Sequence, residues 1–122
     1  MKFISIDHIQ LSMPMGGEDT ARVFYVGLLG LTEVPKPPEL AKRGGAWFEQ
    51  GDVKLHLGVE EEFHLLKKAH LALIVDDLTA FIDQLKNSGY EVDTTQPPLA
   101  GFKRAHLLDP FGNRLELMEK VG

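Results

Sequence analysis

The chain has no cysteine among its 122 residues, and this absence removes several classes of site at once. Disulfide bonds, thiolate nucleophiles and cysteine-based zinc sites are all excluded. A metal site in this chain would have to be built from histidine nitrogens and carboxylate oxygens, with no soft thiolate to select the metal.

Basic charge and long apolar runs are also scarce. Lys and Arg number 13 against 18 Asp and Glu, and the net charge of −5 speaks against a nucleic-acid-binding surface. No apolar run is long enough to span a bilayer, and the first eight residues lack the hydrophobic segment and cleavage site of a signal peptide. We therefore expect a cytoplasmic protein with no nucleic-acid or membrane partner.

An alternating stretch at 53–59 organises what is present. Leu55 and Leu57 point one way in such a strand and His56 the other. The pattern returns about sixty residues later, where Arg114-Leu-Glu116-Leu lies over Lys54-Leu-His56-Leu. Two metal-capable side chains, His56 and Glu116, thus occupy one position of two strand copies.

The rest of the chain supports this duplication, because each half reads strand, helix and three strands. We expect a single domain over 1–122, with repeat one at 1–59, a polar connector at 60–68 and repeat two at 69–122. The fold class is α+β, with two βαβββ repeats. The expected strands are 4–11, 31–34, 46–49, 53–59, 69–75, 90–92, 102–108 and 114–118, and the expected helices are 18–29 and a second one that begins after Asp76 or Asp77.

Four segments of the chain resemble the vicinal oxygen chelate superfamily. They are Ile6-Asp-His8, Leu28-Leu-Gly-Leu31, Ala69-His70 and Asp109-Pro-Phe-Gly-Asn-Arg-Leu-Glu116-Leu. This superfamily includes glyoxalases, methylmalonyl-CoA epimerases, extradiol dioxygenases, and fosfomycin- and bleomycin-resistance proteins. The resemblance implies a glyoxalase-like cupped mixed sheet that holds one divalent metal ion. Carried over by position, the ligands are His8, His56, His70 and Glu116.

Strand alternation supports this ligand set independently. All four side chains are expected on the face opposite the apolar side chains that meet the helices. Imidazole and carboxylate ligands suit Fe, Mn, Ni, Co or Zn, and the sequence does not distinguish these metals.

Three further side chains are candidates for the site. If 109–113 forms a five-residue turn, Leu108 pairs with Arg114, and His106 then lies opposite Glu116. His106 could be a hydrogen-bond partner of a ligand, a proton carrier or a substitute ligand. Arg104, on the same face, could receive a substrate carboxylate or phosphate, and Trp47 could line the pocket. His64, in the charged connector, is expected to be solvated.

Three functions remain open from the sequence. The leading one is a glyoxalase-type lyase or isomerase that acts on a small molecule through a metal-chelated enediolate-like intermediate, with Glu116 or His106 moving the proton. The second is an Fe(II)-dependent dioxygenase, which needs only two histidines and one carboxylate. The third is a non-catalytic binding or resistance protein. We also expect a homodimer, in which the ligand pairs come from one chain or from two.

Overall fold

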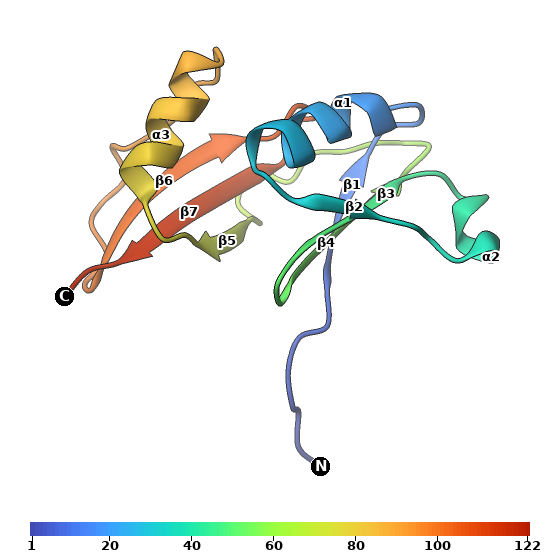
Figure 1. Ribbon diagram of the computed structural model, residues 1–122, viewed down its shortest axis with the longest axis horizontal. Helices are drawn as coiled ribbons and strands as arrows, with labels where there is room; N and C mark the ends of the chain where they lie inside the picture. The colour runs from blue at the N-terminus through green and yellow to red at the C-terminus, as the bar shows by residue number, and fades with distance from the viewer. The chain divides into compact units, whose positions relative to one another are not determined.

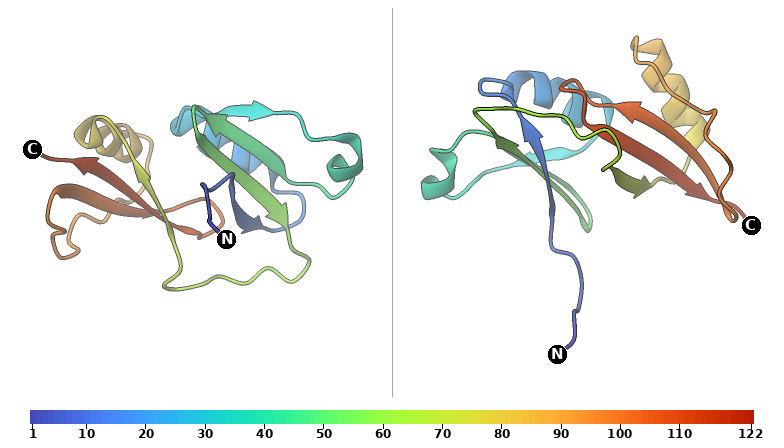
Figure 2. Two further views of the ribbon diagram at one scale, coloured as in Figure 1. Left: turned by 90° about the horizontal axis from the view of Figure 1, so that it is seen from below. Right: turned by 180° about the vertical axis from the view of Figure 1, so that it is seen from behind.

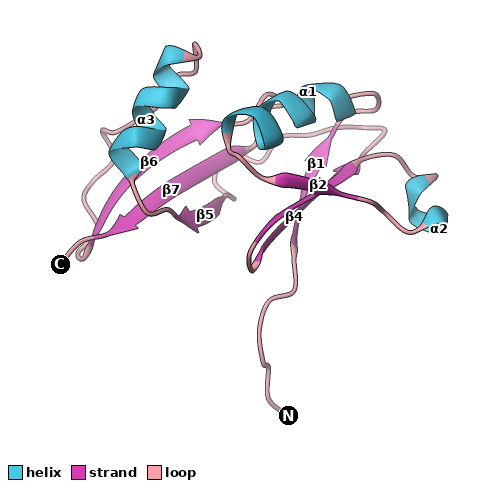
Figure 3. Ribbon diagram, in the orientation of Figure 1, coloured by secondary structure: helices cyan, strands magenta, loops and turns pink.

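The computed structural model describes residues 1–122 and has a mixed α+β architecture. The chain divides into two compact units, 1–64 and 65–122, and each is built around its own small mixed sheet (Figure 3). The strand-helix-strand order of the predicted repeats recurs in both units, so the predicted fold class is confirmed.

The first unit contains a four-stranded sheet in the order β1-β4-β3-β2 (Figure 1). β1 runs parallel to β4, and the other neighbours are antiparallel. The elements are β1 (Ile9–Met13), α1 (Glu18–Arg22), the π-helix η1 (Val23–Leu28), β2 (Thr32–Val34), α2 (Pro38–Ala41), β3 (Ala46–Gln50) and β4 (Val53–Val59).

One face of this sheet packs against α1 and η1. Phe48 and Leu55 are buried opposite one another on β3 and β4, and Tyr25 of η1 stacks on Phe48 with ring centroids 5.4 Å apart. Because side chains alternate along a strand, the neighbouring Trp47 and His56 lie on the other face. The helix-free face therefore carries the polar and aromatic groups, as the alternation predicted.

The second unit contains a three-stranded sheet in the order β5-β7-β6, with α3 packed on β6 and β7 (Figure 2). Its elements are β5 (Leu71–Ile74), α3 (Leu78–Asn87), β6 (Phe102–Leu108) and β7 (Arg114–Lys120). Asp77 caps α3 by accepting a hydrogen bond from the backbone N–H of Ala80 at 3.0 Å. Leu78 and Leu85 of this helix are buried.

Strand register confirms that the two sheets are copies of one pattern. In the first sheet His56 lies between Gln10 on β1 and Trp47 on β3. In the second, Glu116 lies between Ala72 on β5 and His106 on β6. Glu116 is thus the counterpart of His56, and His106 is the counterpart of Trp47.

The same register equates His8 with His70. His8 stands two residues before Gln10, and His70 stands two residues before Ala72. Both histidines directly precede the strand proper, since β1 begins at Ile9 and β5 at Leu71.

The first predicted strand is wrong in its start. The chain enters the ladder only at Ile9, and residues 1–6 run away from the sheet as extended chain (Figure 1). Ile9 pairs with Leu55, and β4 itself begins at Val53, so β4 offers no backbone partner to the residues that precede 7. The apolar alternation of Ile4 and Ile6 therefore has no neighbouring strand to pair with.

Three other elements also differ from expectation. The strand predicted at 90–92 is replaced by a single bridge between Asp93 and His106, so β6 has a largely open outer edge. The short helix α2, with Pro38 at its first position, was not predicted, although proline suits that position. The helix predicted at 18–29 is present, but it continues as η1 after Arg22.

No helix in the structure has the length and apolar character needed to cross a membrane.

Candidate metal centre

Three metal-capable side chains converge on the helix-free face of the second sheet. Glu116 Oε1 lies 3.0 Å from His70 Nε2 and 3.0 Å from His106 Nε2. The ligand atoms of these three residues all lie within 4.8 Å of one another. Two ligands of a common ion, each 2.0–2.2 Å from it and at right angles, are about 3 Å apart, so the nitrogen-to-oxygen spacing fits a shared divalent cation.

The carboxylate of Glu116 is buried, and its negative charge is offset by its neighbours. Burial raises the pKa of the Glu116 carboxyl, but the hydrogen bond with His70, the charge of His106, and the hydrogen bond and charge of Arg104 together bring this pKa below its ordinary value. Glu116 is therefore ionised at neutral pH and available as an anionic ligand or as a base.

The orientation of His70 suits a metal ligand. Its Nδ1 lies 2.8 Å from the carbonyl oxygen of Lys68, so Nδ1 must carry a proton and donate it. When the ring is neutral, Nε2 then holds a lone pair directed at Glu116 Oε1, and two acceptors at that distance need a proton or a cation between them. Metal-bound histidines commonly donate their other N–H to a backbone carbonyl in this way.

His106 is buried and has an unmet hydrogen-bonding need. It is 5% exposed, and its Nδ1 has no hydrogen-bond partner. A buried polar atom without a partner is uncommon and calls for an explanation, such as a ligand of the site. The sequence left three roles open for His106: hydrogen-bond partner of a ligand, proton carrier or substitute ligand. The pairing of β6 with β7 places His106 opposite Glu116, as the five-residue turn predicted.

Arg104 lies beside this group but is already engaged. Its Nη2 and Nε donate to the carbonyl oxygen of Pro97 at 2.6 and 3.2 Å, and its Nη1 donates to Glu116 Oε2 at 3.4 Å. These contacts make Arg104 a neighbour that orients and neutralises Glu116. Its predicted role as a substrate-binding group stays a prediction.

The first unit brings together His8, His56 and Trp47. The His56 ring lies between the other two, with ring centroids 4.0 Å from His8 and 4.1 Å from Trp47, and both pairs are stacked. These three rings line a cavity of about 570 Å³ in the first unit, and the predicted substrate-binding role of Trp47 stays a prediction. Burial, followed by the charge of His8, lowers the pKa of His56, which keeps its ring neutral and able to offer a lone pair.

The four predicted ligands therefore fall into two pairs. His8 and His56 lie together in the first unit, and His70 and Glu116 lie together in the second, where His106 joins them. His64, in the connector, is exposed.

Comparisons with known proteins agree with this architecture. A glyoxalase family protein from Bacillus anthracis is 42% identical, with 99% of this chain and 98% of that chain covered and a TM-score of 0.90. Lactoylglutathione lyase from Agrobacterium tumefaciens is 20% identical, with 91% of each chain covered and a TM-score of 0.69. The antibiotic-binding protein TnmS3 from Streptomyces sp. CB03234 is 23% identical, with 98% and 100% covered and a TM-score of 0.74. The last two likenesses concern the fold alone.

A search among curated proteins finds no match. The sequence model of one superfamily, however, matches residues 5–117, which is nearly the whole chain. The chain belongs to the Glyoxalase/Bleomycin resistance protein/Dioxygenase superfamily.

Proposed function

We propose that this chain is a divalent-metal-dependent enzyme of the glyoxalase type, a lyase or isomerase acting on a small molecule, with His70, His106 and Glu116 holding the ion. The superfamily includes metal-dependent lyases, dioxygenases and resistance proteins. The observation that supports an enzyme is the meeting of two imidazole nitrogens at one buried carboxylate oxygen, 3.0 Å from each.

A bound divalent cation would supply Lewis acidity toward a substrate oxygen. The chain's own residues would then handle the proton on the carbon next to a carbonyl group. Glu116, ionised at neutral pH, is one candidate base. His106 is the other candidate in the arrangement in which it does not bind the ion: its Nε2–H then donates to Glu116, and its Nδ1 carries a lone pair that no protein group occupies.

Metal binding by ligand variants tests this proposal. We expect the wild-type protein to bind Mn²⁺ or Zn²⁺ in calorimetry, and His70→Ala and Glu116→Gln to weaken that binding at least tenfold, because each removes a direct ligand. His64→Ala is the matched control, since it removes an exposed imidazole outside the cluster. Metal affinities that are unchanged in both cluster variants would contradict the site.

The predicted ligand roles of His8 and His56 stay predictions, and the same measurement tests them. If these imidazoles also bind the ion, His8→Ala and His56→Ala will each lower the metal affinity. If they do not, only His70, His106 and Glu116 variants will lose metal, and the first unit's three-ring stack has another role.

One observation favours the iron-dependent dioxygenase as a second candidate. The second unit alone assembles two histidines and one carboxylate, the ligand set of non-haem Fe(II) oxygenases, which leaves positions open for O₂. Oxygen consumption in an electrode cell, with Fe(II)-loaded protein and a panel of catechols, distinguishes the two reactions. Uptake of oxygen that depends on a catechol would favour the dioxygenase over the lyase or isomerase.

A non-catalytic binding protein is the remaining alternative, and it predicts the opposite result in the metal experiment. A protein that only holds a small molecule has no need of the ion, so wild-type protein that takes up no divalent metal would favour it.

A further inference from the structure

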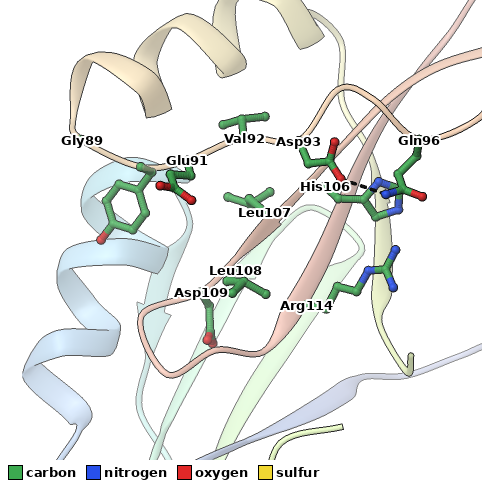
Figure 4. A pocket seen from close by; sticks show the side chains of 11 residues that line it. Gly89, Glu91, Val92, Asp93, Gln96, His106, Leu107, Leu108, Asp109 and Arg114 are labelled. Carbon is green, nitrogen blue, oxygen red and sulfur yellow. Dashed lines mark hydrogen bonds between the residues drawn. The ribbon is translucent and has the colours of Figure 1, made fainter. Parts of the chain in front are cut away.

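A cavity of about 580 Å³ opens in the second unit beside the proposed metal centre (Figure 4). Its wall combines the 89–93 segment with the end of β6 and the start of β7. The cavity exists because the strand predicted at 90–92 does not form, so the edge of β6 beyond the Asp93–His106 bridge lies uncovered. His106 belongs to both places, since its Nε2 contacts Glu116 while the residue lines the cavity.

Arg114 is the one positively charged side chain in the wall of this cavity. In Figure 4 its guanidinium group points toward the His106 ring. The register explains this placement, because Arg114 stands two residues before Glu116 on β7 and so shares its face, with about 7 Å between the two backbone positions. Arg114 is therefore within side-chain reach of a molecule held at the metal centre.

The guanidinium of Arg114 also has unused hydrogen-bonding capacity. Its one hydrogen bond runs from Nη1 to the carbonyl oxygen of Lys67 at 3.5 Å, the outer limit of such a contact, and it forms no ion pair. Arg104 differs, since its donors are occupied by Pro97 and Glu116. Of the two arginines on this face, Arg114 is the one free to bind a ligand.

The acidic groups in the same wall do not neutralise Arg114. Asp93 accepts hydrogen bonds from Thr95 and Gln96, and Asp109 accepts them from its own turn. Glu91 is exposed and forms no ion pair with Arg114. Val92, Leu107 and Leu108 supply an apolar wall between these polar ends.

We propose that Arg114 is the anion-binding residue of this site, so that the substrate carries an oxyanion, a carboxylate or a phosphonate, a few bonds from the oxygens that reach the metal. This inference rests on the proposed function, because it places one end of the substrate at the His70–His106–Glu116 cluster. Arginine suits the role, since its planar fork can donate two parallel hydrogen bonds to an oxyanion.

Three hydroxamates test the proposal in calorimetry with Mn²⁺-loaded protein. Acetohydroxamate has only the metal-binding end, succinohydroxamate adds a carboxylate two methylenes away, and 3-phosphonopropionohydroxamate carries a phosphonate on the same spacer. We expect one or both anionic probes to bind wild-type protein about tenfold more tightly than acetohydroxamate, and Arg114→Gln to abolish that preference while it leaves acetohydroxamate affinity unchanged. The probe that gains more identifies the oxyanion.

Lys103→Gln is the control variant, because it removes a positive charge from the neighbouring strand β6 on the opposite face. We expect it to keep the preference. Equal affinity for all three probes in the wild type, or a preference that survives Arg114→Gln, would overturn the role of Arg114. Mn²⁺ affinity, measured first and without any probe, reports on the proposed function separately: its absence in the wild type overturns the metal site, whereas normal Mn²⁺ binding without an oxyanion preference overturns Arg114 alone.

Discussion

The two sheets place different chemistry at the same three positions. His8, Trp47 and His56 form a stack of rings in the first unit, whereas their counterparts His70, His106 and Glu116 form a hydrogen-bonded cluster in the second. The two sheets differ most at the position that is His56 in the first and Glu116 in the second. A carboxylate there attracts two imidazoles, whereas a neutral imidazole ring stacks on its neighbours.

The buried position of His56 predicts how acid affects the fold. Burial, and then the charge of His8, lowers the pKa of folded His56 below the ordinary value of 6.5, so the unfolded chain binds more protons around that pH. The free energy of unfolding should therefore fall as the pH drops through 6.5. In urea titrations of metal-free protein at pH 7.5 and 5.0, His56→Gln should lose less stability on acidification than the wild type.

His64→Gln provides the comparison, because this imidazole is exposed in the connector. It should lose as much stability on acidification as the wild type does. An equal loss in the His56 and His64 variants would show that burial of His56 does not set this pH dependence.

At the scale of elements, the turn between β6 and β7 determines the geometry of the cluster. Asp109 is buried, and it accepts hydrogen bonds from the backbone N–H groups of Phe111 and Asn113 at 2.9 and 2.8 Å and from the Asn113 side chain at 2.9 Å. These bonds fix the turn length that places His106 opposite Glu116. A shift of one residue would move one of the two to the other face.

We predict that Asp109→Ala lowers the free energy of unfolding by about 2 kcal/mol, because it leaves N–H groups of the turn without their charged acceptor. Urea titration measures this loss. Asp52→Ala, in the exposed turn between β3 and β4, should change stability by less than about 0.5 kcal/mol. Equal effects of the two substitutions would contradict the role of the Asp109 hydrogen bonds.

Elements that pair with close sequence neighbours were predicted well. The boundaries of β6 and the start of β4 follow from alternation and turn residues, and the turn length alone gave the pairing of His106 with Glu116. The start of β1 was predicted too early, and a strand was predicted at 90–92 where none forms. Both outcomes depend on whether a strand distant in the sequence has an unpaired edge beside the segment. Tertiary pairing overrides local propensity in such segments.

The candidate site was also predicted only in part from the sequence. His70 and Glu116 were expected together, and the structure brings them within 3.0 Å. The anchoring of Arg104 to Pro97 and the free guanidinium of Arg114 could not be anticipated, since they depend on the path of the 94–101 loop and on the missing strand.

At the scale of the whole molecule, the extended N-terminal residues leave apolar side chains without cover. Phe3 is 92% exposed and Ile6 75% exposed, and Met1 and Ile4 are exposed as well. Such a segment of alternating apolar residues, together with sheet edges that have only one neighbour, favours association with a second chain.

We therefore predict that the protein is a homodimer. The double variant Phe3→Ser/Ile4→Ser should shift the equilibrium toward monomer, which sedimentation equilibrium measures. Met15→Ser/Val23→Ser is the matched control, because these two apolar side chains are also exposed but lie outside the N-terminal segment. It should leave the mass unchanged. A wild-type monomer, or a Phe3/Ile4 variant that keeps the dimer mass, would contradict this assignment.

Trp47 is the single tryptophan of the chain, and it stacks on His56 at 4.1 Å. Tryptophan fluorescence consequently reports on the first sheet only, because the second sheet has histidine at the matching position. The duplicated architecture thus contains a natural optical label on one copy, so a titration that quenches tryptophan emission indicates a proton, ion or small molecule that acts near the His8–His56–Trp47 stack.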